Sequence, residues 1–174
     1  MLEEIKQRVK KECSNPDFKH HKWFWDYHII PMKNIALTLA KDYDIDSEVI
    51  ELIAYLHDIA KIRGMDNHAP EGAKIASEWI KEHPQKDLIV ECIEKHNKPF
   101  EEDSDPVKLI ASADAVSHFL SPFFEIFFWE NPDKEIKDIL VGNLRKAEKD
   151  WNRILLPKAR DMCRKEYEAL KRFS

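Results

Sequence analysis

Two aspartates and four histidines have the residue types and positions of metal ligands. Asp58 lies in IAYLHDIA and Asp114 in LIASADAVS, and a carboxylate within a buried helical stripe is costly unless it is paired or bound to a metal. Histidine nitrogens combined with carboxylate oxygens favour a divalent transition metal (Mn, Fe, Co, Ni or Zn), with Mg²⁺ as an alternative. Such an ion lowers the pKa of a bound water to about 7 and polarises a phosphoryl oxygen. The histidines, which fall near expected helix ends, are His28, His57, His68 and His96.

The adjacent residues His57 and Asp58 cannot form such a site alone. Successive positions on a helix differ in direction by about 100°, so we expect the pair to hold an ion only at the rim of a pocket. Other helices must then complete the ligand set. His28 and Asp114 are the natural candidates to do so.

The order of these residues resembles the HD superfamily of metal-dependent phosphohydrolases. That family's pattern is a histidine, a His-Asp pair and a distant aspartate on a helical bundle, and here it reads His28, His57-Asp58, Asp114. The segment LIAYLHDIAKIR is similar to the family's LHDI-x-K segment, and HAPEGAKIA and IEKHNKP resemble two further helix ends. The resemblance covers about residues 20–120, and we expect 121–174 to be a helical C-terminal extension.

The resemblance implies a role for each of these positions. It implies a catalytic metal whose bound hydroxide attacks phosphorus. The ligands of this metal would be His28, His57, Asp58 and Asp114. In members with two metals, the positions of His68 and His96 bind the second ion. The alternative is that these two histidines donate hydrogen bonds to substrate phosphates beside a single ion. We therefore expect one or two ions.

Two more residues are candidates for contact with a substrate. Lys61 follows Asp58 by three positions on the same side of the helix, so it would bind phosphate in catalysis or orient Asp58. A solvated lysine at a helix end is the alternative. His118 follows Asp114 by four positions, where it would orient Asp114, touch substrate or pack in the core.

A third group of candidates lies in the C-terminal extension. Arg145, Lys149 and Arg153 are spaced four apart and form a basic stripe on one helix. Most such stripes are solvated faces, and phosphate binding is the alternative.

The rest of the sequence predicts the helices that position these residues. Apolar residues recur with a spacing of 3.6, strand-type alternation is nearly absent, and there are only three glycines. We expect an all-α, HD-domain-like bundle of about seven to nine helices in one domain over residues 1–174. Ser47 is the expected cap of the third helix, and Gly64 its end. The expected helices are one stopped near Ser14, and then about 23–42, 48–61, 70–82, 84–97, 106–119, 122–130, 132–155 and 157–172.

Composition limits the class of protein. The chain is 43% hydrophobic and 35% charged, which is typical of a folded globular protein. No apolar run approaches the roughly 20 residues that cross a bilayer, and the N-terminus has no signal-peptide core, so we predict a cytoplasmic location and no membrane partner. The three cysteines are far apart and predict neither a disulfide scaffold nor a thiolate site. A net charge of −5 argues against a large nucleic-acid footprint, which would need a basic face.

Two aromatic segments bear on partners. The cluster at 23–27 predicts packing in the core or a dimer, with stacking on a nucleobase as the alternative. The run FFEIFFW at 123–129 would present aromatics on several sides of a helix. This pattern indicates deep burial or a partner surface, and a homodimer is the simplest proposal.

The leading functional hypothesis is a metal-dependent phosphohydrolase acting on a nucleotide or another phosphate ester or anhydride. The pattern does not choose between a phosphomonoesterase, a phosphodiesterase and a pyrophosphatase. Two alternatives stay open: a di-iron oxygenase of the same superfamily, which requires His68 and His96 as ligands, and a non-catalytic module that binds a nucleotide or a metal.

Overall fold

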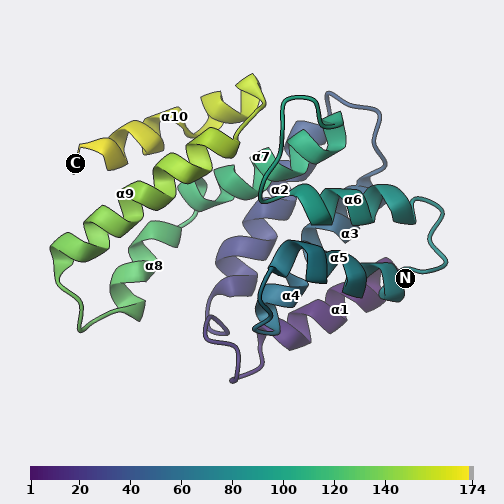
Figure 1. The fold of residues 1–174 in the computed structure, drawn as a ribbon, viewed down its shortest axis with the longest axis horizontal. Coiled ribbons are helices and arrows are strands. Elements are labelled where there is room, and N and C mark those ends of the chain that lie inside the picture. The colour runs from purple at the N-terminus through teal and green to yellow at the C-terminus, as the bar shows by residue number, and fades with distance from the viewer. Residues whose placement is uncertain (173–174) are drawn as a thin grey trace.

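Helices joined by loops make up the computed structural model, which describes residues 1–172 (Figure 1). Among these residues nine helices have eight residues or more and there is no strand, which confirms the expected all-α fold. Two short segments complete it, the π-helical turn η1 (Trp25–Ile29) and the single turn α4 (Ile59–Ile62). The nine helices are α1 (Leu2–Cys13), α2 (Ile30–Ala40), α3 (Ser47–Leu56), α5 (His68–Trp79), α6 (Lys86–Lys95), α7 (Asp105–Leu120), α8 (Phe123–Glu130), α9 (Ile136–Arg153) and α10 (Pro157–Lys171).

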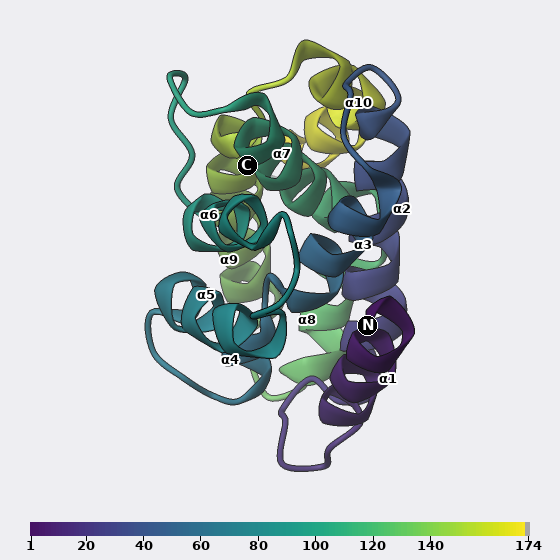
Figure 2. The same ribbon diagram turned by 90° about the vertical axis from the view of Figure 1, so that its right-hand side faces the viewer.

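Helix α7 runs through the middle of the molecule and joins its two ends. It packs against α2 and α6 on one side and against α9 and α10 on the other. Figures 1 and 2 show α1, α4 and α5 at one end of the molecule and α8 to α10 along the opposite side. Every residue from Leu109 to Phe119 is buried, as expected of a helix enclosed by neighbours. Asp114 therefore lies in the interior, as its apolar surroundings predict.

The expected helix 48–61 is interrupted at His57 and Asp58, which corrects the sequence prediction. Helix α3 ends at Leu56, and Asp58 has a non-helical backbone (φ −110°, ψ 17°) before α4 begins. The Nδ1 of His57 lies 2.9 Å from the carbonyl oxygen of Ala54, so a local side-chain bond competes with the helical ladder here.

The start of α3 also differs from the prediction. Its N-cap is Asp46 rather than Ser47, because an Asp46 carboxylate oxygen accepts a hydrogen bond from the amide of Glu48 at 2.8 Å.

The expected helix 23–42 is divided into η1 and α2. Pro31 lies in the first turn of α2, where a missing N–H costs little. His28 lies in η1, directly before the regular helix, as the sequence predicts. Single π-helical turns are frequent at functional sites, because the extra residue redirects side chains.

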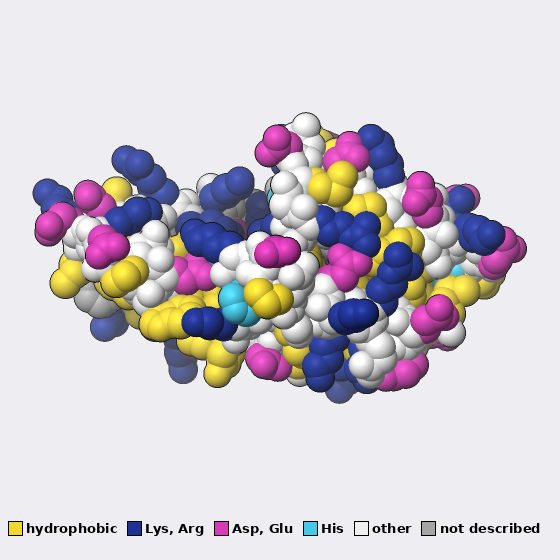
Figure 3. Space-filling view, turned by 90° about the horizontal axis from the view of Figure 1, so that it is seen from below, with side chains coloured by type: hydrophobic (Ala, Val, Ile, Leu, Met, Phe, Trp, Pro, Cys, Tyr) yellow, Lys and Arg dark blue, Asp and Glu magenta, His cyan; other side chains and the backbone are white. Residues whose placement is uncertain are grey.

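The two aromatic segments differ in how far their side chains are buried. Trp23, Phe24 and Trp25 are buried in the core, whereas Tyr27 is 46% exposed. In α8 the two leading phenylalanines are buried, but Trp129 is 58% exposed. Hydrophobic side chains are also visible toward the end of the molecule where α8 and α9 lie (Figure 3).

Over residues 1–172, none of the helices is long and apolar enough to span a membrane. The three cysteines are buried and free.

Candidate functional site

The first group of side chains that could hold a metal ion joins η1, the α3–α4 break and α7. The Nε2 of His28 lies 3.1 Å from Nε2 of His57 and 3.6 Å from Oδ1 of Asp114. His57 Nε2 is 3.8 Å from the same carboxylate oxygen, and all three residues are buried. Because Nδ1 of His57 faces the Ala54 carbonyl, that nitrogen carries the proton and Nε2 keeps its lone pair for a ligand.

The second group consists of Asp58, His68 and His96. Asp58 Oδ1 lies 3.5 Å from His68 Nε2 and 3.7 Å from His96 Nε2. This oxygen is buried and has no hydrogen-bond partner among residues 1–172. A buried carboxylate oxygen without a partner is costly, and it faces two histidine nitrogens. A bound cation would satisfy all three atoms.

The short connection between Asp58 and His68 does not keep them apart. Gly64 and Asn67 adopt left-handed backbone conformations (φ 68° and 51°), and these reverse the chain so that α5 begins beside Asp58. Helix α5 also approaches the break closely, since a Cβ placed on Gly72 would lie 3.5 Å from the carbonyl oxygen of His57.

Asp58 faces both groups at once. Its Oδ2 lies 3.2 Å from Nε2 of His28 and accepts a hydrogen bond from Lys61 at 2.8 Å, while Oδ1 faces the second group. His57 is 0% and Asp58 1% exposed, so the pair lies in the interior and not at a pocket rim. The expectation of a rim position was wrong because it assumed an unbroken helix.

Both groups fit a divalent metal. Each combines two histidine nitrogens with a carboxylate oxygen, the donor set that transition metals accept. Bonds from such ions to these atoms are about 2.0–2.2 Å, so ligand atoms 3.1–3.8 Å apart can share one ion. The buried, unpartnered oxygen of Asp58 is the strongest sign of a missing cation.

One carboxylate from each group lines a cavity of about 130 Å³. Asp58 and Asp114 line this cavity, and so do His68 and His96. Cationic side chains form much of the remaining wall, namely Lys61 from α4 and Lys146, Lys149 and Arg153 from α9. An anion bound in the cavity would therefore contact several positive charges.

Helix α9 supplies residues that sequence reasoning largely missed. Arg153 donates to Asp114 Oδ2 and to Asp150 Oδ1, both at 2.8 Å, and Lys146 donates to Asp150 at 2.6 Å. The predicted stripe of Arg145, Lys149 and Arg153 is only partly correct, because Arg145 is exposed and Lys146 lines the cavity instead. The available signal was Asp150, with a lysine four positions before it and an arginine three after it.

His118 connects α9 to the first group. Its Nδ1 lies 2.9 Å from Oδ2 of Asp150, and its Nε2 is 3.7 Å from Oδ1 of Asp114. That Nε2 is buried without a hydrogen-bond partner, and the residue lines the cavity. Contact of His118 or Lys61 with substrate stays a prediction.

The two carboxylates are held in their ionised form. Burial raises the pKa of Asp58, but Lys61 and His57 outweigh burial and keep that pKa well below the usual range. The pKa of Asp114 is also well below the usual range, because Arg153 and His118 outweigh the effect of burial. Both side chains are therefore anionic acceptors at neutral pH.

His28 and His57 are held neutral. Burial lowers the pKa of His28 to about 4 in spite of the nearby Asp58 and Asp114. Burial also lowers the pKa of His57. Neutral imidazole is the form that binds metals, so both residues are suited to this role at neutral pH.

The fold and the ordered ligand set define a class of protein. The HD domain family model matches residues 25–118, more than half of the chain, and the chain therefore belongs to the HD-domain family. This confirms the resemblance that the sequence suggested. Helix α9, with its cationic residues, lies outside the matched region.

Curated relatives match about half of the chain. Ribonuclease Y of Mycoplasma mycoides subsp. mycoides SC is 29% identical over 93 residues, or 52% of this chain and 18% of the relative. Ribonuclease Y of Clostridium botulinum (strain Hall) is 31% identical over 90 residues, or 52% of this chain and 17% of the relative. The chain thus spans less than a fifth of the length of these relatives. No solved structure gives a significant match.

Proposed function

We propose that this protein is a metal-dependent phosphohydrolase that adds water to phosphorus and breaks the P–O bond of a phosphate ester or anhydride. One observation carries the proposal. The carboxylates of two His/Asp groups line a single small cavity, and four cationic side chains line it as well, beside one further acid, Asp150. A phosphoryl group is the substrate that such a combination suits, since its charge requires both metal and lysine or arginine partners.

The residues that would hold the first ion are His28, His57, Asp58 and Asp114, and Asp58, His68 and His96 would hold a second. When bound, the metal supplies a Lewis acid and lowers the pKa of water toward about 7. The chain's contribution is orientation: Arg153 fixes Asp114, and the Ala54 carbonyl fixes the ring of His57.

The cationic walls would bind the non-bridging phosphate oxygens. Lys149 makes no ion pair with the residues described and is exposed, so it is available to an anion. Lys61 is 38% exposed and bonds only one oxygen of Asp58, so its ammonium can turn from that oxygen to a phosphate. Each such contact counts more as negative charge develops on the transferring group.

The substrate proposal is a nucleotide or short oligonucleotide. The curated relatives are named ribonucleases, which favours a phosphodiester among the phosphate esters. The net charge of −5 favours a small substrate over a long nucleic acid. The oxygenase alternative has one observation in its favour, which is that His68 and His96 face Asp58 as a second ligand group.

The test combines elemental analysis with a substrate panel. Purified protein would be assayed with p-nitrophenyl phosphate, bis-p-nitrophenyl phosphate, ADP and a dinucleotide, each with Mn²⁺, Co²⁺, Ni²⁺ or Mg²⁺. We expect metal-dependent release of phosphate or alcohol from at least one compound. Tight nucleotide binding without turnover under every metal would favour the non-catalytic module instead. Iron in the protein together with oxygen consumption would favour the oxygenase.

A further inference from the structure

A second cavity of about 350 Å³ lies next to the metal centre, between the α1–η1 loop and the end of α4. Lys61 lines both cavities. The first cavity, at about 130 Å³, has less than half the volume of the second, and residues of both candidate ligand groups line it. We therefore place the reacting phosphoryl group in the first cavity. A substrate larger than one phosphate can extend past Lys61 into the second cavity.

The second cavity has a polar and cationic lining. Its charged members are Lys19, Lys61, Arg63 and a single acid, Asp17. The apolar members are Phe18 and Ile62, which are only 7% and 5% exposed. They offer little ring or alkyl surface for a nucleobase to stack on. Recognition here would therefore rest on charge and hydrogen bonding, which suits an anionic group.

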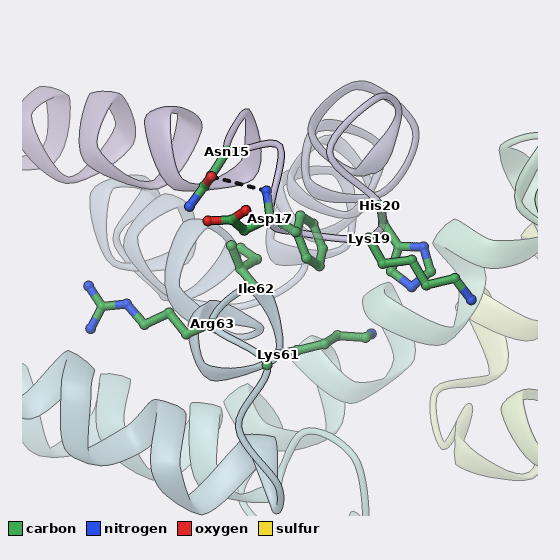
Figure 4. A pocket seen from close by; sticks show the side chains of 9 residues that line it. Asn15, Asp17, Lys19, His20, Lys61, Ile62 and Arg63 are labelled. Atoms are coloured by element: carbon green, nitrogen blue, oxygen red, sulfur yellow. Dashed lines mark hydrogen bonds between the residues drawn. The ribbon is translucent and has the colours of Figure 1, made fainter.

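Among the described residues of this lining, Lys19 is unpaired, whereas Lys61 and His20 each contact a single carboxylate, of Asp58 and Glu130. Figure 4 shows Lys61 extending toward His20 and Lys19, while Arg63 points to the opposite side. Arg63 is engaged by Glu12. Lys19 is exposed and has no hydrogen bond or ion pair with the residues described. Nδ1 of His20 lies 2.7 Å from a carboxylate oxygen of Glu130, which fixes the ring.

From this arrangement we infer that the second cavity binds a second phosphate group of the substrate whose reacting phosphate occupies the metal centre. Lys61 would contact both phosphates, with Lys19 and His20 on the far side of the second one. The inference rests on the proposed hydrolase function and narrows it to substrates with at least two phosphates. Two sources share this chemistry, a phosphoanhydride chain and the next phosphate of an oligonucleotide.

The test compares ligands that differ in their number of phosphates and resist cleavage, so AMP is used as its phosphonate analogue, in which CH₂ replaces the ester oxygen. Calorimetry with Mn²⁺ would measure the Kd of AMP, of α,β-methylene ADP and of a 5′-phosphorylated, phosphorothioate-linked dinucleotide. We expect wild type to prefer one of the two-phosphate ligands over AMP, and the ligand preferred identifies the source. Lys19→Glu should reduce that preference by about two- to fivefold, the size of one exposed charge pair.

The matched control is Lys22→Glu. Lys22 is exposed in the same loop but does not line the cavity. It should retain the wild-type preference. Equal binding of AMP and both two-phosphate ligands, or an unchanged preference in Lys19→Glu, would overturn the inference. Because binding needs no turnover, this result is distinct from failure of the hydrolase proposal, which would appear as no cleavage in the substrate panel.

Discussion

Asp58 belongs to the second candidate ligand group and also contacts His28 of the first. One of its oxygens faces His28 and Lys61, and the other faces His68 and His96 without a hydrogen-bond partner. Such a carboxylate is stable in the interior only because cations and imidazoles surround it. Substitution of Asp58 therefore tests the proposed metal site directly.

We expect Asp58→Asn to remove metal and activity while keeping the side chain's shape. Metal affinity should fall by more than about 100-fold, because outer-shell partners alone are worth about 10–100-fold. Elemental analysis and the substrate panel would measure both effects. The control is Asp44→Asn, an exposed aspartate outside the cavity. Full metal content and activity in Asp58→Asn would show that the metal assignment is wrong.

Lys61 acts in opposite directions on metal and substrate. Its ammonium lies 2.8 Å from Asp58 Oδ2 and competes with a cation for that oxygen. We expect Lys61→Met to bind metal as tightly as wild type or more tightly, whereas kcat falls about 10- to 100-fold through loss of a phosphate contact. Metal titration and steady-state kinetics separate the two effects. Weaker metal binding with unchanged kcat would contradict this role.

At the scale of elements, α9 completes the site from outside the family match. It does so through Asp150, which is fully buried and accepts hydrogen bonds from Lys146 and Arg153. Arg153 in turn orients Asp114 on α7. The C-terminal helices are thus joined to the candidate metal site by charge as well as by packing.

We expect Asp150→Asn to destabilise the protein by about 3–5 kcal/mol, since it leaves buried cations without their partner. Urea unfolding at pH 7 would measure the loss. The control Asp161→Asn removes an exposed partner of Arg164 and should change stability by less than about 1 kcal/mol. Equal effects from the two substitutions would contradict the structural role of Asp150.

The same residue predicts a pH dependence. Burial raises the pKa of Asp150, but His118 and Lys146 outweigh it, and the net pKa is lowered. A carboxyl whose folded-state pKa lies below its unfolded value of about 3.9 stabilises the fold above that pH. The contribution is lost as the pH falls through the folded pKa. Wild type should therefore lose stability below about pH 4 more steeply than Asp150→Asn, measured by urea unfolding across that range.

At the scale of the whole molecule, an apolar end remains uncovered. Trp129 is 58% and Ile136 66% exposed, close to the start of α9. The aromatic run at 123–129 is thus only partly buried, and the predicted homodimer stays a prediction. Large exposed apolar side chains grouped at one end are typical of interaction surfaces.

Sedimentation would test that prediction. We expect wild type to sediment as a dimer at micromolar concentration and Trp129→Asp to shift it toward monomer, because a charge there opposes burial. Phe100→Asp is the control, since Phe100 is 68% exposed but lies in the loop before α7. A monomeric wild type over the whole concentration range would contradict the dimer.

Much of the fold and the order of the candidate ligands could be predicted from sequence. Helical spacing and proline positions specify most helices, because amphipathic periodicity and a missing N–H act locally. His28, His57-Asp58 and Asp114 could be selected because a buried carboxylate needs a partner, wherever the chain later brings that partner from.

Only the tertiary structure decided how these residues meet. The helix break at His57 and Asp58 depends on competition between a side-chain bond and the helical ladder, which periodicity does not detect. The cationic wall from α9 and the second cavity beside Lys61 require segments far apart in sequence to pack together. The sequence by itself determined a helical protein with a candidate metal site. Packing decided its depth, the charge around it and the neighbouring cavity, because these depend on contacts between helices that no local pattern encodes.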